Sequence, residues 1–245
     1  MRLTELASVG PFFAVRAGEG PAGAAERAGY LLLGEEAVRA RVGVVAERLG
    51  TEDRRVAASV AYQGIAGRLL SVALGSAVLS GEVPDAAGGR LRWDPARTAP
   101  DDLWLPEPVA LPPAGDGLAG LIRERVLRGP LAELHAATRR VVAISGRLLW
   151  GNAASSLAGS LRVLHAWCCA QGRPEDAARA TALARAVLGD PLLRGTGTLA
   201  PDAAPGTAPG AAPPFVRSTC CLYYRALPGG MCGDCVLRHA PPRVR

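Results

Sequence analysis

Residues 51–80, TEDRRVAASVAYQGIAGRLLSVALGSAVLS, decide the fold class. Apolar residues recur along this stretch at helical spacing, at Val56, Val60, Ile65, Leu69 and Val72. The pattern predicts one long helix with a buried face, capped by Thr51 and ending near Ser80. Its most apolar part, Leu69–Leu79, is broken by Gly75 and is too short to span a bilayer. We therefore expect a buried core helix and no membrane span.

Shorter helices are expected before and after this stretch. Residues 24–49 have a broadly helical pattern, with Gly29 and Gly34 as candidate breaks and Gly50 at the end. Residues 1–23 look irregular. In residues 82–115, seven prolines forbid long helices. The runs Arg90–Trp93 and Leu103–Leu105 in this insertion are expected to form short strands, paired as a hairpin.

The second half of the chain is again helical in pattern. Helices are expected over residues 116–129, over 131–148, from 153 to about 170, and over 174–188, with a break at Arg147–Asn152 and Asn152 as the cap of the third. Residues 189–214 are rich in Pro, Gly, Ala and Thr, which predicts a linker. The fold class is therefore mainly α with a small β element (α+β). A helical body at residues 1–188 precedes the linker and a cysteine-rich tail at 215–245.

Composition excludes several classes of chemistry. The chain of 245 residues has a net charge of +6, and all 28 of its basic residues are arginine. Without lysine there is neither a Schiff-base anchor nor a P-loop lysine. The arginines are scattered and aromatics make up only 4% of the chain, so no nucleic-acid partner is expected. The N-terminus lacks the apolar region of a signal peptide, so a cytoplasmic protein with reduced thiols is expected.

The tail holds four of the six cysteines: Cys220, Cys221, Cys232 and Cys235. Their pattern is Cys-Cys-x10-Cys-x2-Cys, and four thiolates so close in sequence can converge on a soft metal centre. An adjacent pair is awkward for a zinc knuckle and easier to place on a two-iron cluster. The spacing therefore favours iron–sulfur over zinc and leaves zinc open. Arg217 and Arg225 would favour thiolates and offset the negative charge of the cluster.

This cysteine pattern, with Tyr224-Arg225 after the first pair and Gly233-Asp234 inside the second, resembles the ferric-siderophore reductase (FhuF) family. Two other segments support the resemblance. Arg147–Ser155, RLLWGNAAS, is similar to a central Leu-Trp-Gly-Asn-Ala segment of that family, and Ser8–Phe12 is similar to its N-terminal opening. Val236 departs from the family pattern, in which proline is expected after the last cysteine.

The resemblance implies a [2Fe-2S] cluster held by the four tail cysteines. It also implies an enzyme that gives one electron to Fe(III) in a ferric siderophore, so that Fe(II) is released in the cytosol. The electron would come from an external donor such as a ferredoxin or a reductase. No G-x-G-x-x-G fingerprint follows a predicted strand, so no built-in NADPH or flavin domain is expected.

Candidate substrate contacts are weaker predictions. They are Tyr223, Tyr224, Arg225, Trp150 and Asn152, for each of which a packing or capping role is the alternative. Two other functions stay open from the sequence. One is a zinc-stabilised four-cysteine binding module without redox activity, and the other is a relative that binds the chelate and has lost reductase activity.

Overall fold

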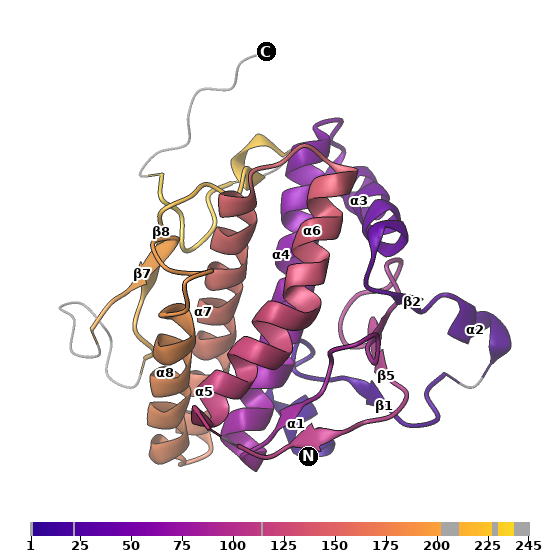
Figure 1. Cartoon of the computed structure of the whole chain (residues 1–245). Coiled ribbons are helices and arrows are strands. Elements are labelled where there is room, and N and C mark those ends of the chain that lie inside the picture. Colours follow the sequence, from indigo (N-terminus) through magenta and orange to yellow (C-terminus); the bar gives the residue numbers. More distant parts are fainter. Residues whose placement is uncertain (1, 22, 114, 202–210, 227–229, 238–245) are drawn as a thin grey trace.

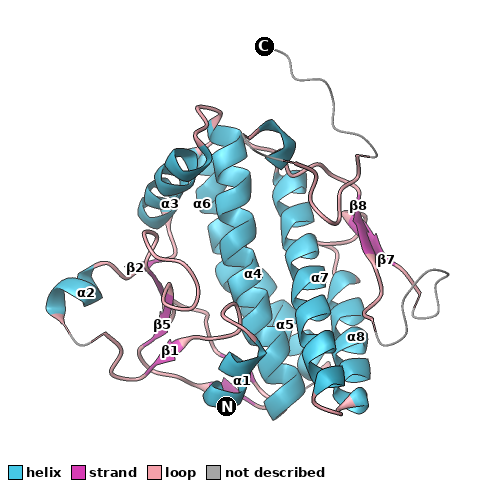
Figure 2. Cartoon of the chain, turned by 180° about the vertical axis from the view of Figure 1, so that it is seen from behind, coloured by secondary structure: helices cyan, strands magenta, loops and turns pink. Residues whose placement is uncertain are grey.

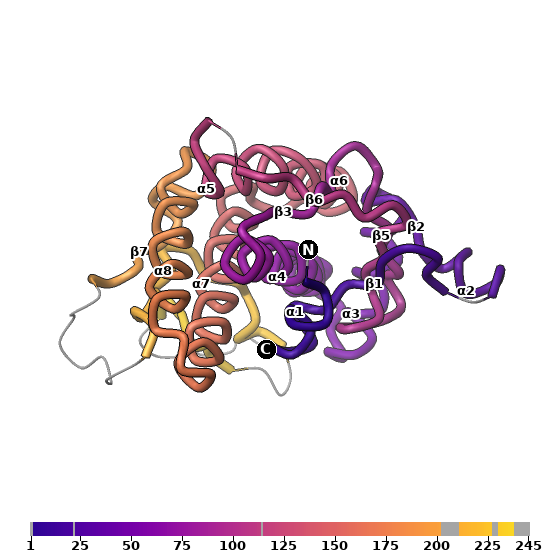
Figure 3. The backbone as a smooth tube through the Cα atoms, turned by 90° about the horizontal axis from the view of Figure 1, so that it is seen from below, coloured from indigo at the N-terminus to yellow at the C-terminus, as the bar shows by residue number. Residues whose placement is uncertain are grey.

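A computed structural model describes residues 2–21, 23–113, 115–201, 211–226 and 230–237. Its centre is α4 (Arg54–Ser80), and Figure 3 looks along this helix with the other helices around it. α7 (Gly146–Ala170) packs against α4 along its length, with α8 (Pro174–Leu188) beside α7. α3 (Glu35–Leu49) and α6 (Ala132–Val141) cover the other side (Figure 1, Figure 2). The α-rich α+β fold class is confirmed.

The central helix matches its prediction except at the first residue. Asp53, and not Thr51, is the cap, because its carboxylate accepts a hydrogen bond from the amide of Arg55 at 3.0 Å. The helix ends at Gly81 in the left-handed conformation. α4 is long and apolar enough to cross a membrane, but 83% of its most apolar window is buried inside the protein.

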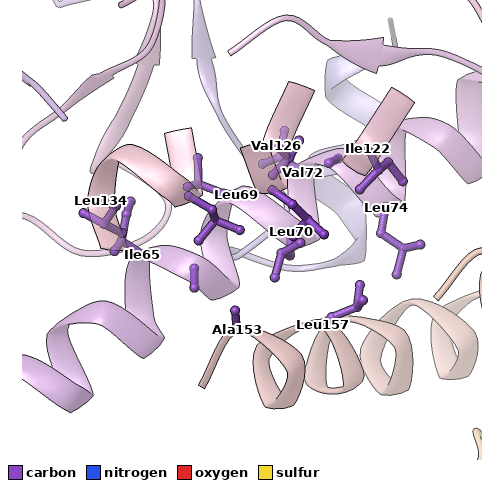
Figure 4. Close-up of a cluster of buried hydrophobic side chains, with 14 of the residues drawn as sticks. Ile65, Leu69, Leu70, Val72, Leu74, Ile122, Val126, Leu134, Ala153 and Leu157 are labelled. Carbon is purple, nitrogen blue, oxygen red and sulfur yellow. The ribbon is translucent and has the colours of Figure 1, made fainter. Parts of the chain in front are cut away.

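The core around α4 is built from Leu, Val, Ile and Ala. Figure 4 draws some of its side chains and labels Ile65, Leu69, Leu70, Val72, Leu74, Ile122, Val126, Leu134, Ala153 and Leu157. The N-terminal residues also join this core, although the sequence predicted them to be irregular. They form α1 (Leu3–Val9), which buries Leu6 and Val9. Leu6 approaches α4 at Gly75, where a Cβ atom would lie 2.4 Å from Leu6 Cδ1.

The predicted hairpin is present. β4 (Arg92–Trp93) and β5 (Leu103–Leu105) pair antiparallel in a sheet of order β1-β5-β4-β2, with β1 (Arg16–Ala17) and β2 (Leu31–Leu32) at its edges. β3 (Val83–Pro84) pairs with β6 (Ala110–Leu111). The break near Gly29 and Gly34 is also present, since α2 (Ala24–Ala28) and β2 precede α3.

The largest difference from the prediction lies between α5 and α7. After α5 (Gly117–Ile122), a helical segment (Arg123–Leu131) is kinked at Gly129, where the predicted helix ends, and leads into α6, which ends at Val141 instead of near residue 148. α7 then begins at Gly146, because Ser145 caps it by accepting from the amide of Leu148 at 3.4 Å. The predicted break at Arg147–Asn152 is therefore wrong. Trp150, Gly151 and Asn152 lie inside a continuous helix.

The predicted linker at residues 189–214 is partly packed. β7 (Gly197–Leu199) pairs antiparallel with β8 (Phe215–Arg217), and Asp190, Leu193 and Thr196 are buried. Because Leu193 and Leu199 join the core, this part of the segment differs from the extended chain that its composition predicted. Residues 202–210 of the predicted linker lie outside the described residues, as do 238–245 of the tail.

Candidate metal centre

β8 leads directly into the cysteine tail, which crosses the ends of α4 and α7 (Figure 1). The tail brings Cys221 and Cys232 together, with their Sγ atoms 3.7 Å apart. Two sulfurs on one tetrahedral metal ion, at bond lengths of about 2.3 Å, lie about 3.8 Å apart. The distance between these two sulfurs is thus close to the spacing of two thiolate ligands on one metal ion.

The chemistry of the donor set fits an iron–sulfur cluster, because four cysteine thiolates are the ligands that a [2Fe-2S] cluster takes. Within the described ranges, no three His, Cys, Asp or Glu side chains form a group that could hold one metal ion. The other two tail sulfurs each accept a hydrogen bond from a backbone amide. Leu222 donates to Cys220 Sγ and Leu237 donates to Cys235 Sγ, each at 3.4 Å. Such amide contacts stabilise thiolate sulfur and tune iron–sulfur clusters.

The thiols of the tail differ in acidity. The sulfur contact with Cys232 lowers the pKa of Cys221 to about 6, and it raises the pKa of Cys232, because a proton shared between the two sulfurs stabilises the first thiolate. Burial raises the pKa of Cys220. The positive charge of Arg217 lowers the pKa of all three thiols.

A buried carboxylate attaches the second cysteine pair to α7. Asp234 lies between Cys232 and Cys235 and accepts from Ser155 Oγ and from Arg162 Nη1, both at 2.7 Å. The backbone oxygen of Asp234 also accepts from the amide of Arg217 at 3.0 Å. The second cysteine pair is therefore tied to α7 and to β8 through the residue inside it.

A second set of buried hydrogen bonds attaches the first cysteine pair. Ser59 of α4 donates to the backbone oxygen of Cys221 at 2.6 Å, and Asn152 of α7 donates to the backbone oxygen and to Oγ of Ser59 at 2.9 Å. Arg217 in turn donates to Asn152 Oδ1. Gly151 allows this approach, because a Cβ atom there would lie 2.1 Å from Thr219 Oγ1.

Residues 217–237 match the family model of the FhuF 2Fe-2S C-terminal domain. This segment of the tail is similar to that domain, and we refer to it below as the FhuF-type domain. Its cofactor is a [2Fe-2S] cluster, so the zinc alternative that the spacing left open is not retained. No curated protein sequence matches the chain.

A cavity of about 600 Å³ lies beside the FhuF-type domain. Its walls come from residues 10–13, from α4, from α7 and from the tail, which contributes Cys221, Tyr223, Cys232, Gly233 and Asp234. Small residues line the helices, including Gly64 and Gly67 of α4 and Gly159 of α7. Cys221 and Cys232 thus form part of the wall of a cavity that is large enough for an organic ligand.

A buried arginine positions the N-terminal wall of this cavity. Arg68 donates to the backbone oxygens of Pro11, Phe12 and Ala14, at 2.9 Å for Pro11 and 2.5 Å for Ala14. Its charge is balanced by Asp102 at 2.8 Å. The segment that resembles the N-terminal opening of FhuF proteins is therefore held in place at the cavity next to the FhuF-type domain.

The structure separates the weaker site predictions into three groups. Tyr223 lines the cavity. Asn152 is fully buried and holds the tail through Ser59 and Arg217, instead of capping a helix. The remaining three do not line the cavity: Trp150 stacks on His135 with ring centroids 4.7 Å apart, and Arg225 binds Tyr224 and Asp53 on the surface.

Sequence reasoning did not identify Ser59 or Arg162 as parts of the site. Ser59 contacts a residue 162 positions away, and nothing near Ser59 in the sequence marks that contact. Arg162 is one of many arginines in a chain without lysine. Asp234 did carry a signal, since it was part of the motif that resembles the FhuF family.

Proposed function

We propose that this protein is a ferric-siderophore reductase of the cytosol. An external donor, a ferredoxin or another reductase, supplies one electron, and Fe(III) in the chelate becomes Fe(II). The oxygen donors of the chelator are matched to Fe(III) and hold Fe(II) far less well, so reduction releases the iron. No bond to the protein forms or breaks. The observation that carries this proposal is the cavity of about 600 Å³ with Cys221 and Cys232 in its wall.

The four tail cysteines would hold the cofactor, and a [2Fe-2S] cluster supplies one-electron chemistry when bound. Electron transfer needs the chelate to be held close to Cys221 and Cys232, and the cavity offers that position. Gly64, Gly67 and Gly159 widen the cavity by presenting no side chains to it. Tyr223 would contact the chelate from the tail side, and Phe12 from the N-terminal side.

The test is to fill the cavity without touching the tail. A Cβ atom at Gly64 would meet no other atom within 4 Å, so Gly64→Leu places a side chain in open space on the cavity wall. Leucine also favours helix over glycine by up to about 1 kcal/mol, so folding should not suffer. We expect iron content and visible spectrum to stay as in the wild type. The KM for a ferric siderophore should rise about tenfold, a loss of about 1.4 kcal/mol of binding.

The matched control is Gly43→Leu, an exposed position in α3 where a Cβ atom also meets nothing. This variant should reduce the chelate with the KM of the wild type. If Gly64→Leu carries a full complement of iron and also keeps the wild-type KM, the chelate does not enter this cavity.

A further inference from the structure

Arg217 is a buried cation with no carboxylate partner in the part of the chain that the structure describes. Its side chain is among the most buried in the protein, with 2% of the residue exposed. Its hydrogen bonds go to neutral oxygens: the backbone oxygen of Thr219 at 3.0 Å, Gln63 Oε1 at 3.5 Å, and Asn152 Oδ1. Among the described residues, no Asp or Glu forms an ion pair with it.

A second fully buried arginine, Arg68, differs in this respect. Arg68 is equally buried, and its guanidinium lies 2.8 Å from Asp102. A buried charge left unpaired in a medium of low dielectric costs several kcal/mol, so proteins pair such charges. The neutral oxygens around Arg217 satisfy its hydrogen bonds but leave its charge uncompensated. Because no described carboxylate supplies the compensating negative charge, the cysteine thiolates of the tail are left as its source.

Arg217 lies between the two cysteine pairs. Its backbone amide donates to the oxygen of Asp234, next to Cys235, and its Nε donates to the oxygen of Thr219, next to Cys220. Through Asn152 and Ser59 it is linked to the backbone oxygen of Cys221. The four thiolates of the FhuF-type domain belong to these segments, and the other negative group there, the carboxylate of Asp234, is already paired with Arg162 at 2.7 Å.

We propose that Arg217 is the counter-charge of the [2Fe-2S] cluster and raises its reduction potential. A four-thiolate cluster is already negative, and reduction adds one further negative charge. A fixed positive charge close by, in a region from which water is excluded, stabilises the reduced state more than the oxidised state. Arg217 thus acts as a positioning and tuning residue. This role does not depend on which molecule accepts the electron.

The two arginines nearest the tail surface provide the comparison. Arg225 is 41% exposed and pairs with Asp53 at 3.4 Å, while Arg162 is 45% exposed and pairs with Asp234 at 2.7 Å. Solvent and a paired carboxylate both reduce the field that such a charge exerts. The potential should therefore respond to the charge at position 217 and hardly at all to the charge at 225.

The test is a spectroelectrochemical titration of the cluster in the purified full chain. It compares the wild type with Arg217→Gln, Arg217→Lys and Arg225→Gln. We expect Arg217→Gln to reduce the equilibrium constant for one-electron reduction about tenfold, which is about 59 mV toward lower potential. Arg217→Lys keeps the charge and should stay within threefold of the wild type, as should Arg225→Gln. A loaded Arg217→Gln protein with the potential of Arg225→Gln would overturn the proposal.

Loss of the cluster in Arg217→Gln would still leave the proposal testable. Gln63 lies on the cavity wall, and Gln63→Glu would give Arg217 a carboxylate partner with almost no change in shape. This variant should also shift the potential downward, and a loaded Gln63→Glu protein with the wild-type potential would overturn the proposal. The proposal is also supported if Arg217→Lys holds the cluster while Arg217→Gln and Gln63→Glu both lose it. A cluster lost from all three would show that Arg217 serves only the fold of the tail.

The readout is a potential measured without any chelate. A protein that reduces no siderophore, but whose potential follows the charge at position 217, would refute the proposed function and leave this inference standing.

Discussion

Asp234 connects the cysteine tail to the helical body through a carboxylate that is almost fully buried. Both of its oxygens are used, one by Ser155 and the other by Arg162, in short charge-assisted hydrogen bonds. Because it lies within the Cys232–Cys235 pair, its position also fixes the orientation of that pair relative to α7. One side chain therefore contributes both to stability and to the geometry of the metal centre.

Replacing Asp234 with alanine should loosen the tail. Hydrogen bonds to a charged group contribute about 1.5–3 kcal/mol each, so we expect Asp234→Ala to lower the free energy of unfolding by at least about 2 kcal/mol. Iron content should fall as well. Denaturant unfolding followed by circular dichroism, together with iron analysis of the same sample, measures both.

Glu35→Gln is the control for that measurement. It removes a carboxylate from an ion pair with Arg140 in which both side chains are exposed, and such pairs contribute no more than about 1 kcal/mol. Equal losses in the two variants, with iron content unchanged, would mean that Asp234 does not hold the tail.

The site could be predicted from the sequence only where its residues are close in the chain. The spacing of four cysteines within sixteen residues indicates a metal site, and it is also the basis of the resemblance to the FhuF family. Ser59, by contrast, meets Cys221 only because α4 and the tail come together in the folded protein. Asn152 was a candidate because of its residue type, but the sequence cannot distinguish an asparagine that caps a helix from one that makes buried hydrogen bonds to distant residues.

Among the elements, α7 shows most clearly where sequence reasoning failed. Trp-Gly-Asn reads as a helix break, because glycine and asparagine are common at helix ends. In the fold, Ser145 starts the helix earlier, and Gly151 is needed as a contact surface for Thr219 and Arg217. The glycine thus serves close packing of the tail, which local propensity does not reveal.

Gly151→Leu should therefore harm the protein although leucine is the better helix former. A side chain at this position meets Thr219 at once, and Arg217 Nη2 lies 3.6 Å from the added Cβ atom. We expect the variant to keep its helical content but to lose the cluster and at least about 1 kcal/mol of stability. Circular dichroism, the visible spectrum and a melting curve provide the measurement.

Gly43→Leu again serves for comparison, since it makes the same change in a helix where the added atom is free. It should match the wild type or melt slightly higher. A Gly151→Leu protein that holds its full iron content would show that the tail does not need this close approach.

Elements with strong local signals were predicted well. α4, α8 and the β4–β5 hairpin follow from apolar periodicity and from proline and glycine positions. α1 was not predicted because it is short and because its burial depends on contacts with α4, which cannot be inferred from the sequence of α1 alone. β7 was missed for a similar reason, since it is a strand only through its pairing with β8.

At the scale of the whole molecule, the cavity is a product of assembly. Its walls come from the N-terminal segment, two long helices and the tail, and no one of these encloses it alone. The same assembly places Cys221 and Cys232 at the wall and leaves Arg225 and Tyr224 on the surface. For this reason we propose chelate binding in the cavity and no such role for the tyrosine–arginine pair of the motif.

The most direct test is a single turnover without an external donor. The protein is reduced with dithionite under anaerobic conditions, freed of excess reductant, and mixed with a ferric siderophore and a coloured Fe(II) chelator. We expect the visible absorption of the oxidised cluster to return and Fe(II) to appear in equal amount and at the same rate. A reduced protein that stays bleached in the presence of ferric siderophores, with no Fe(II) formed, would contradict the claim that it is their reductase.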